Sequence, residues 1–197
     1  MAVVANPKIK IKEATAQEIC AGLELSEDAR AHLDGQIAPL PFLDAVVGQA
    51  LYADAIQFLA RALPKREAVW WSATCVRELA SDDKRPELAA GLEAAENWVY
   101  RPTEENRRGA EKAANAIKDS HPARWTAMAA FWSGGSLAPA DKPEVKPAED
   151  FTAKAVASAV TVAALLDPQQ ITARNKRFLE AGRDIANGGT GRPPAKS

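Results

Sequence analysis

The sequence is poor in the residues that most often carry catalysis or bind metal ions. Among 197 residues it has two histidines, His32 and His121, and two cysteines, Cys20 and Cys75. The cysteines are too far apart to form a CxxC pair, and no HxxxH spacing is present. No serine or cysteine motif marks either histidine as a catalytic base. The sequence therefore predicts no metal site and no catalytic residue.

Phosphate-binding loops are also missing. Glycine clusters occur at 134–135 and at 188–191, but neither continues into a Lys-Ser or Lys-Thr helix start. Both clusters follow predicted helix ends, where the helix dipole is negative and repels anions. We interpret them as a helix cap and a tail, and we expect no cofactor.

Charge and hydropathy exclude two further classes of partner. The formal net charge is -1, whereas a broad nucleic-acid surface needs clustered positive charge. The best membrane candidate, Phe151–Leu166, contains Lys154 and is shorter than the roughly 20 apolar residues of a spanning helix. The start of the chain has no apolar signal segment. We expect no nucleic-acid or membrane binding, and a cytoplasmic protein with reduced thiols.

What the chain has instead is alanine, well-placed proline and helical spacing of apolar residues. Pro64, Pro122 and Pro168 each end one apolar pattern and open the next, and proline suits the first turn of a helix. We predict an all-α fold of stacked antiparallel helical hairpins, as an irregular bundle or a short HEAT-like solenoid. The three prolines should lie in first helical turns. The longer helices are expected at 42–62, 64–80, 86–100, 103–119, 122–133, 150–166 and 168–186.

The positions of the helical signals, prolines and glycines predict one domain with two irregular ends. Residues 1–14 should be an extended or flexible arm, because the first helical signal appears near Thr15. Residues 15–187 should form a single helical domain. Within it, residues 138–149 carry three prolines at four-residue spacing and should form an extended crossing segment. The glycine- and proline-rich residues 188–197 should be a disordered tail.

One tryptophan lies outside the apolar stripe of its helix. At about 100° per residue, Trp70 falls nearly opposite the stripe that should face the core, and it shares its face with Arg66 and Arg77. Tryptophan and arginine are enriched in protein-binding hot spots. Either a second helix layer covers this face, which is the arrangement we favour, or the three residues line a groove that binds another protein.

One carboxylate lies inside an apolar stripe. In the helix expected at 42–62, Asp54 shares the face of Leu43, Val47 and Phe58. A buried carboxylate must be paired or protonated, because desolvating a lone charge costs several kcal/mol. We prefer a structural carboxylate bonded to an arginine, an indole N–H or a helix start; the functional alternative is an acid at a site.

Four segments resemble a bacterial family of unknown function whose members are encoded among type VI secretion genes. They are Leu63–Trp71, Trp98–Arg108, Phe131–Pro139 and Phe178–Ala186, and the likeness covers about residues 60–188. The resemblance carries over no catalytic residue, because the family has no established chemistry. It implies a cytoplasmic accessory of the secretion apparatus, such as an adaptor or chaperone for a spike or effector protein.

These observations favour a non-catalytic, protein-interaction module whose partner is another protein. Two other functions stay open. The first is a small enzyme that uses Asp54 with His121 or an arginine in one pocket. The second is an immunity-type inhibitor of a toxin, because residues 13–63 hold eight acids against Arg30 and Arg61. A pocket that gathers Asp54 and His121 would favour the enzyme, and an acidic groove would favour the inhibitor.

Overall fold

A computed structural model describes residues 9–79, 83–139 and 141–192. These residues form helices and no strand, which confirms the all-α class. Their helices are α1 (Ala16–Cys20), α2 (Glu27–Arg30), α3 (Pro39–Gly48), α4 (Tyr52–Ala62), α5 (Lys65–Arg77), α6 (Pro86–Tyr100), α7 (Glu104–Ala116), α8 (Pro122–Phe131), α9 (Phe151–Leu165) and α10 (Ile171–Ala186).

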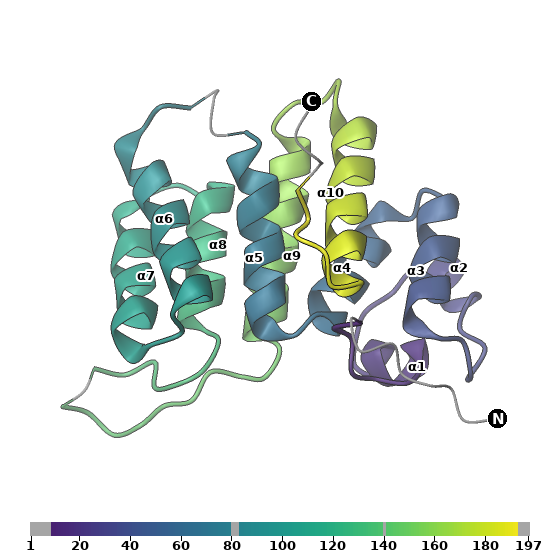
Figure 1. The fold of residues 1–197 in the computed structure, drawn as a ribbon, viewed down its shortest axis with the longest axis horizontal. Coiled ribbons are helices and arrows are strands. Elements are labelled where there is room, and N and C mark those ends of the chain that lie inside the picture. Colours follow the sequence, from purple (N-terminus) through teal and green to yellow (C-terminus); the bar gives the residue numbers. More distant parts are fainter. Residues whose placement is uncertain (1–8, 80–82, 140, 193–197) are drawn as a thin grey trace.

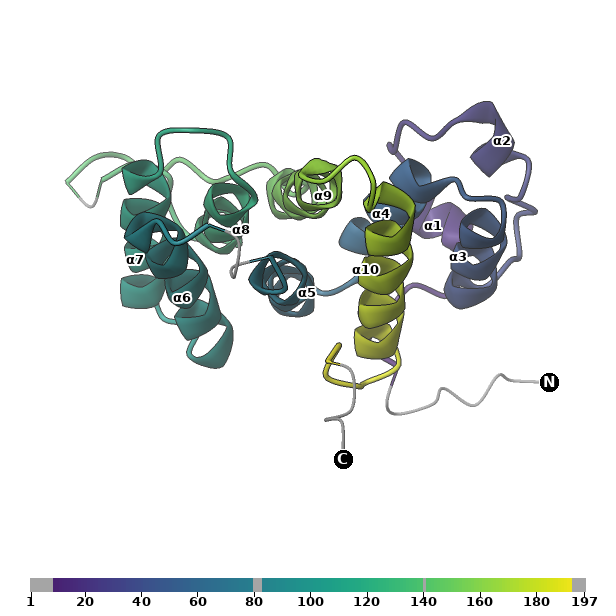
Figure 2. The same cartoon turned by 90° about the horizontal axis from the view of Figure 1, so that it is seen from above.

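The helices α5 and α9 pack face to face in the middle of the bundle (Figures 1 and 2). On one side lie α6, α7 and α8, and on the other lie α10, α4 and α3. The helix α9 touches α4, α5, α8 and α10, and its inward face is built from Ala155, Ala159 and Ala163, which are at most 1% exposed. Such small side chains let neighbouring helices approach closely, so α9 is the axis of the fold.

The helix expected at 42–62 differs from the structure in two ways: it is divided in two, and it begins earlier, at Pro39. The helix expected at 42–62 is divided into α3 and α4 at Ala50, which has a φ of 59°. A non-glycine residue in this left-handed region ends a regular helix. Pro39 and Pro41 lie in the first turn of α3, where the missing proline N–H has no intrahelical partner to lose.

The three punctuating prolines take three different positions. Pro122 is the first residue of α8, as predicted. Pro64 is the N-cap of α5 and precedes its first turn, contrary to the prediction. Pro168 was wrongly placed in a first helical turn, because α10 begins only at Ile171. There the Asp167 carboxylate accepts the Gln169 backbone N–H at 3.0 Å, a side-chain turn that delays the helix.

The first and last segments that the structure describes both pack on α5 and α10. In the arm, the Lys10 N–H donates to the Ala186 carbonyl at 2.8 Å, and Ile11 is buried; residues 1–8 of the predicted arm lie outside the described part. After α10, Gly188–Arg192 fold back toward α5. The sequence analysis predicted a disordered tail for these residues. Residues 193–197 of that tail lie outside the described part as well.

One close contact between helices depends on a glycine. A Cβ added at Gly182 of α10 would lie 2.5 Å from the Leu59 side chain and 2.7 Å from the Trp71 ring. The Trp71 indole N–H also donates to the Phe178 carbonyl at 2.7 Å. Trp71 is fully buried, so α5 and α10 can meet at this separation only if residue 182 has no side chain.

We expect Gly182→Ala to destabilise the protein by about 1–3 kcal/mol, because overpacking forces a rigid indole to move. The same substitution at Gly109, inside α7 with open space around it, should stabilise by about 0.5–1 kcal/mol, because alanine is the better helix former. Urea unfolding of the two variants checks the opposite signs; equal effects would contradict the packing described.

Candidate functional site

The three predicted protein-binding residues all lie on α5, and its two arginines hold α6. The Arg66 Nε donates to the Val99 carbonyl at 2.5 Å, close to the end of α6. The Arg77 guanidinium donates two hydrogen bonds to the Glu96 carboxylate of α6, from Nε to Oε1 at 3.0 Å and from Nη2 to Oε2 at 2.6 Å. These two guanidinium groups therefore attach α5 to α6.

Trp70 is half-buried and is covered by the C-terminal segment instead of by a second helix layer. Its indole N–H donates to the Thr190 carbonyl at 2.9 Å. The Arg192 guanidinium lies over its ring, 4.8 Å from the centroid. The Tyr100 ring packs edge-on against the indole, with the two ring centroids 5.9 Å apart. The cation on the indole is thus Arg192, which sequence reasoning did not associate with this face.

Asp54 is buried, with 6% of its surface exposed, and it caps another helix. The Ser26 backbone N–H donates to its Oδ1 at 2.8 Å, and the Ser26 hydroxyl donates to its Oδ2 at 2.9 Å. The Ser26 Oγ in turn accepts the Ala29 N–H at 3.1 Å and forms the N-cap of α2. The carboxylate therefore holds a helix start against α4, as in the structural interpretation of this residue.

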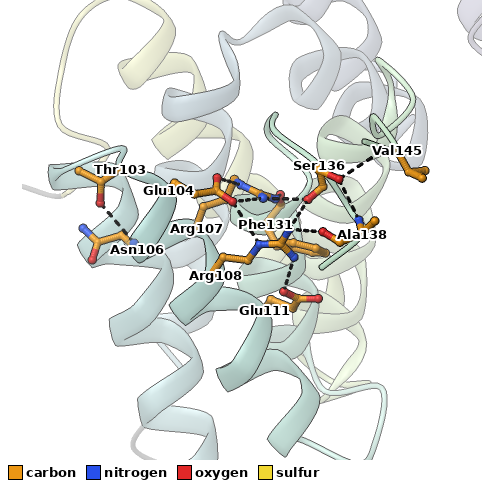
Figure 3. A network of polar contacts seen from close by, with 10 residues as sticks. All are labelled: Thr103, Glu104, Asn106, Arg107, Arg108, Glu111, Phe131, Ser136, Ala138 and Val145. Atoms are coloured by element: carbon orange, nitrogen blue, oxygen red, sulfur yellow. Dashed lines mark hydrogen bonds and ion pairs between the residues drawn. The ribbon is translucent and has the colours of Figure 1, made fainter. Parts of the chain in front are cut away.

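A buried arginine that sequence reasoning missed forms a network of hydrogen bonds (Figure 3). Arg107 of α7 is 3% exposed. It binds both oxygens of Glu104 at 2.6 Å and donates to the carbonyls of Phe131 at 2.7 Å and Ser136 at 2.8 Å. These bonds hold the pKa of Glu104 below its usual value. Arg107 therefore ties α7 to the end of α8 and to the segment that follows it.

Arg108 extends this contact along the crossing segment. It donates to the Ser136 and Ala138 carbonyls and pairs with Glu111 at 2.9 Å. Gly135 makes room for the guanidinium of Arg107, since an added Cβ would lie 2.9 Å from its Nε. The sequence pattern could have indicated that Arg107 is buried, because it shares one helix face with the buried Ala110 and Ala114. Asp54 was found by the same kind of pattern, a charged residue inside an apolar stripe.

His121 lies in a cavity of about 490 Å³ with Asp83, Arg85 and Asp119. Its Nδ1 accepts the backbone N–H of residue 123 at 3.1 Å, so the imidazole caps the start of α8. Burial lowers its pKa, and the positive charge of Arg85 lowers it further. Asp54 does not line this cavity. The pair of residues that would favour an enzyme is therefore not gathered there.

The two thiols are buried and free. Burial raises the pKa of Cys20 to about 11 and raises that of Cys75 well above its ordinary value. Both are therefore protonated at neutral pH, and a protonated thiol is neither a strong nucleophile nor a metal ligand. Among the residues that the structure describes, no cluster of histidine, cysteine or carboxylate side chains could hold a metal ion, and no helix could span a membrane.

A depression with a volume of about 1020 Å³ follows the outer face of α9. Its floor consists mainly of small side chains. Leu23, Ala53 and Gln57 form one wall, and Trp125 of α8 stands on the opposite side. The charged residues that line the depression are of both signs: Glu24, Arg61, Glu149, Asp150 and Lys154. We call this depression the α9 groove.

The comparisons with known proteins place the chain in a family without a described activity. The sequence profile of DUF6931, a family of unknown function, matches residues 42–186. Because this range is more than half of the 197 residues, the chain belongs to that family. No curated protein and no solved structure matches the chain.

We expect Asp54→Ala to lower the free energy of unfolding by about 1–3 kcal/mol, because two donors of Ser26 lose their acceptor. The control is Asp44→Ala, which removes an ion pair with Arg183 whose two side chains are about half exposed; such pairs contribute less than about 1 kcal/mol. Chemical unfolding measures both. Equal losses would mean that Asp54 does not hold the start of α2.

The cap at His121 should make stability depend on pH. Its folded-state pKa lies below the ordinary value of 6.5; its contribution is therefore fully present above that value and is lost as pH falls through the folded pKa. His121→Asn supplies a cap oxygen that does not titrate. Thermal unfolding between pH 8 and 5 should show a loss in the wild type that the variant lacks. Parallel curves would contradict the cap.

Proposed function

We propose that the protein is a non-catalytic interaction module that binds a helical segment of another protein in the α9 groove. We further propose that it is a cytoplasmic adaptor or chaperone in bacterial type VI secretion, for a spike or an effector protein. The single observation that carries the first part is the groove itself, which is open and is built from the axis of the fold.

The floor of the groove suits a partner helix. Ala153, Ala157 and Thr161 recur at four-residue spacing along α9, and all three are only partly buried. Small side chains in this pattern leave a furrow into which the ridge of a second helix can pack. An amphipathic helix laid in a groove is a common mode of protein recognition.

The walls supply the contacts that a helix would need. Trp125 is a large, half-buried aromatic side chain of the kind that dominates binding energy at interfaces. On the opposite side, Gln57 and Arg61 of α4 border the groove and offer polar groups for its rim. A partner helix with small or apolar residues on one face and mixed charges on its flanks fits these walls.

The arrangement of charges supports this proposal over the two alternatives. The groove carries positive and negative side chains together, whereas the inhibitor alternative rests on an acidic groove. Asp54 is bound to Ser26 and does not line the cavity of His121, whereas the enzyme alternative uses Asp54 with His121 or an arginine in one pocket. The secretion role rests on the resemblance of the four segments alone.

The experiment places a photo-crosslinking amino acid at Ala157, on the floor of the groove. The matched control carries the same group at Ala116, an exposed alanine of α7. Each chain is expressed in the native organism and irradiated, and the crosslinked proteins are identified by mass spectrometry. We expect a protein, among them a type VI secretion component, that crosslinks from residue 157 and not from residue 116.

A second variant tests the groove without a crosslinker. Ala157→Arg adds a long side chain to the floor while leaving the buried face of α9 intact, so stability should stay close to the wild type. Capture of the crosslinked partner should fall at least about tenfold, which corresponds to about 1.4 kcal/mol. If the partner binds this variant and Ala116→Arg equally, the groove is not the binding site. If no secretion component is captured, that part of the proposal is wrong.

A further inference from the structure

Residues Gly188–Arg192 fold back from the end of α10 toward the side of α5 that faces away from α9 (Figures 1 and 2). There Thr190 and Arg192 contact Trp70, and we call this side of α5 the Trp70 face. We call Gly188–Arg192 the C-terminal strap. Its Gly189 N–H donates to the Asp184 carbonyl at 2.8 Å, and its Gly191 N–H donates to the Asp184 carboxylate at 2.9 Å. The last turn of α10 thus directs the chain back toward α5.

The strap depends on glycine at the point where it turns. Gly191 has a φ of +71°, a conformation that other residues rarely adopt. An added Cβ at this position would also lie 2.6 Å from the side chain of Ile185, which is buried. The glycine-rich composition that predicts a flexible tail is therefore also what permits this close packing.

The strap is recognised through two kinds of contact that any peptide of similar chemistry could make. One is a backbone acceptor: the Thr190 carbonyl accepts a hydrogen bond from the Trp70 indole N–H at 2.9 Å. The other is a cation: the guanidinium of Arg192 lies 4.8 Å from the centre of the indole ring. Trp70 is half-buried and Arg192 is exposed, and cation–π contacts at exposed sites are weak. This part of the strap is therefore held by contacts that a competitor can replace.

Charge beside the strap also favours a cationic ligand. A cavity of about 650 Å³ lies between α5, α6 and α10, and Arg192 is part of its lining. The helices contribute two arginines, both paired, and a larger number of acids to this cavity. The arginines are Arg77, paired with Glu96, and Arg177, paired with Glu78. The acids are Glu78, Glu96, Glu180 and Asp184. Without the strap, the lining therefore has an excess of negative charge that attracts a guanidinium or ammonium group.

We propose that the Trp70 face is a docking site for an extended, arginine-bearing peptide of a partner protein, and that the C-terminal strap occupies it in the partner's absence. A backbone carbonyl of the partner peptide accepts a hydrogen bond from the Trp70 indole N–H. An arginine of the same peptide stacks on the indole ring, beside the acidic cavity. Because the strap is joined to α10 by a short connection, its effective concentration is high. Only a peptide with further contacts displaces it.

The test follows the indole N–H of Trp70 by NMR in the full-length chain labelled with ¹⁵N-tryptophan. The sequence has five tryptophans, and Trp70→Phe identifies the signal. Gly191→Val should release the strap and speed the hydrogen exchange of this indole by about fivefold or more, the factor for one lost hydrogen bond. Gly35→Val, at an exposed glycine with open space, is the matched control and should change nothing.

The second step adds the ligand as a separate molecule. An amidated synthetic peptide of residues 187–192 is titrated into the Gly191→Val chain, and into an Arg192→Glu chain in case the first variant folds poorly. The Trp70 signal should return toward its wild-type position as the peptide binds. A peptide with alanine in place of the arginine should bind about two- to fivefold more weakly, the factor expected for one exposed cation–π contact.

Three results would overturn the proposal. The first is an unchanged Trp70 signal in both strap variants, which would mean that the strap does not cover the indole in solution. The second is a released indole that binds neither peptide, or binds both equally. The third is a wild-type dimer that Gly191→Val converts to a monomer, because the occupant would then be the strap of a second copy of this chain.

Discussion

The carbonyl groups at the ends of helices have no partner inside their own helix, and in this protein arginines of neighbouring helices supply the missing donors. Arg66 does so for α6, Arg107 for α8 and Arg174 for α9. Arg107 and Arg174 are themselves at least nine-tenths buried. The remainder of the packing follows from these contacts, because each one fixes where one helix ends against the side of another.

The segments through which the chain resembles its family are the segments that meet at these joints. The stretch at 63–71 reaches 98–108 through Arg66, and 98–108 reaches 131–139 through Arg107. The stretch at 178–186 accepts the Trp71 indole N–H and carries the glycine beside that ring. The recognisable residues are therefore largely engaged in joining helices. The floor of the α9 groove lies outside these four stretches.

Local signals in the sequence predicted local structure well. The helix at 86–100 was predicted with the bounds that α6 has, because a proline opens it and Arg101-Pro102 closes it. The break between α3 and α4 was missed, because nothing in the side chain of Ala50 announces a positive φ. The cover on Trp70 was missed for a different reason: its donor and acceptor lie 120 residues apart, and composition describes residues 188–192 without reference to what they touch. Spacing alone does not distinguish an arginine at a binding site from one that caps another helix.

The most direct test of this account is the free energy of unfolding of Arg107→Met, compared with that of Arg183→Met. Arg107 donates to two carbonyls from a buried position, whereas Arg183 forms an exposed pair with Asp44. Methionine keeps much of the aliphatic volume and removes the donors. The account predicts a loss of about 3 kcal/mol for the first variant and less than about 1 kcal/mol for the second. Equal and small losses would contradict it, because the helices would then be held by apolar packing alone.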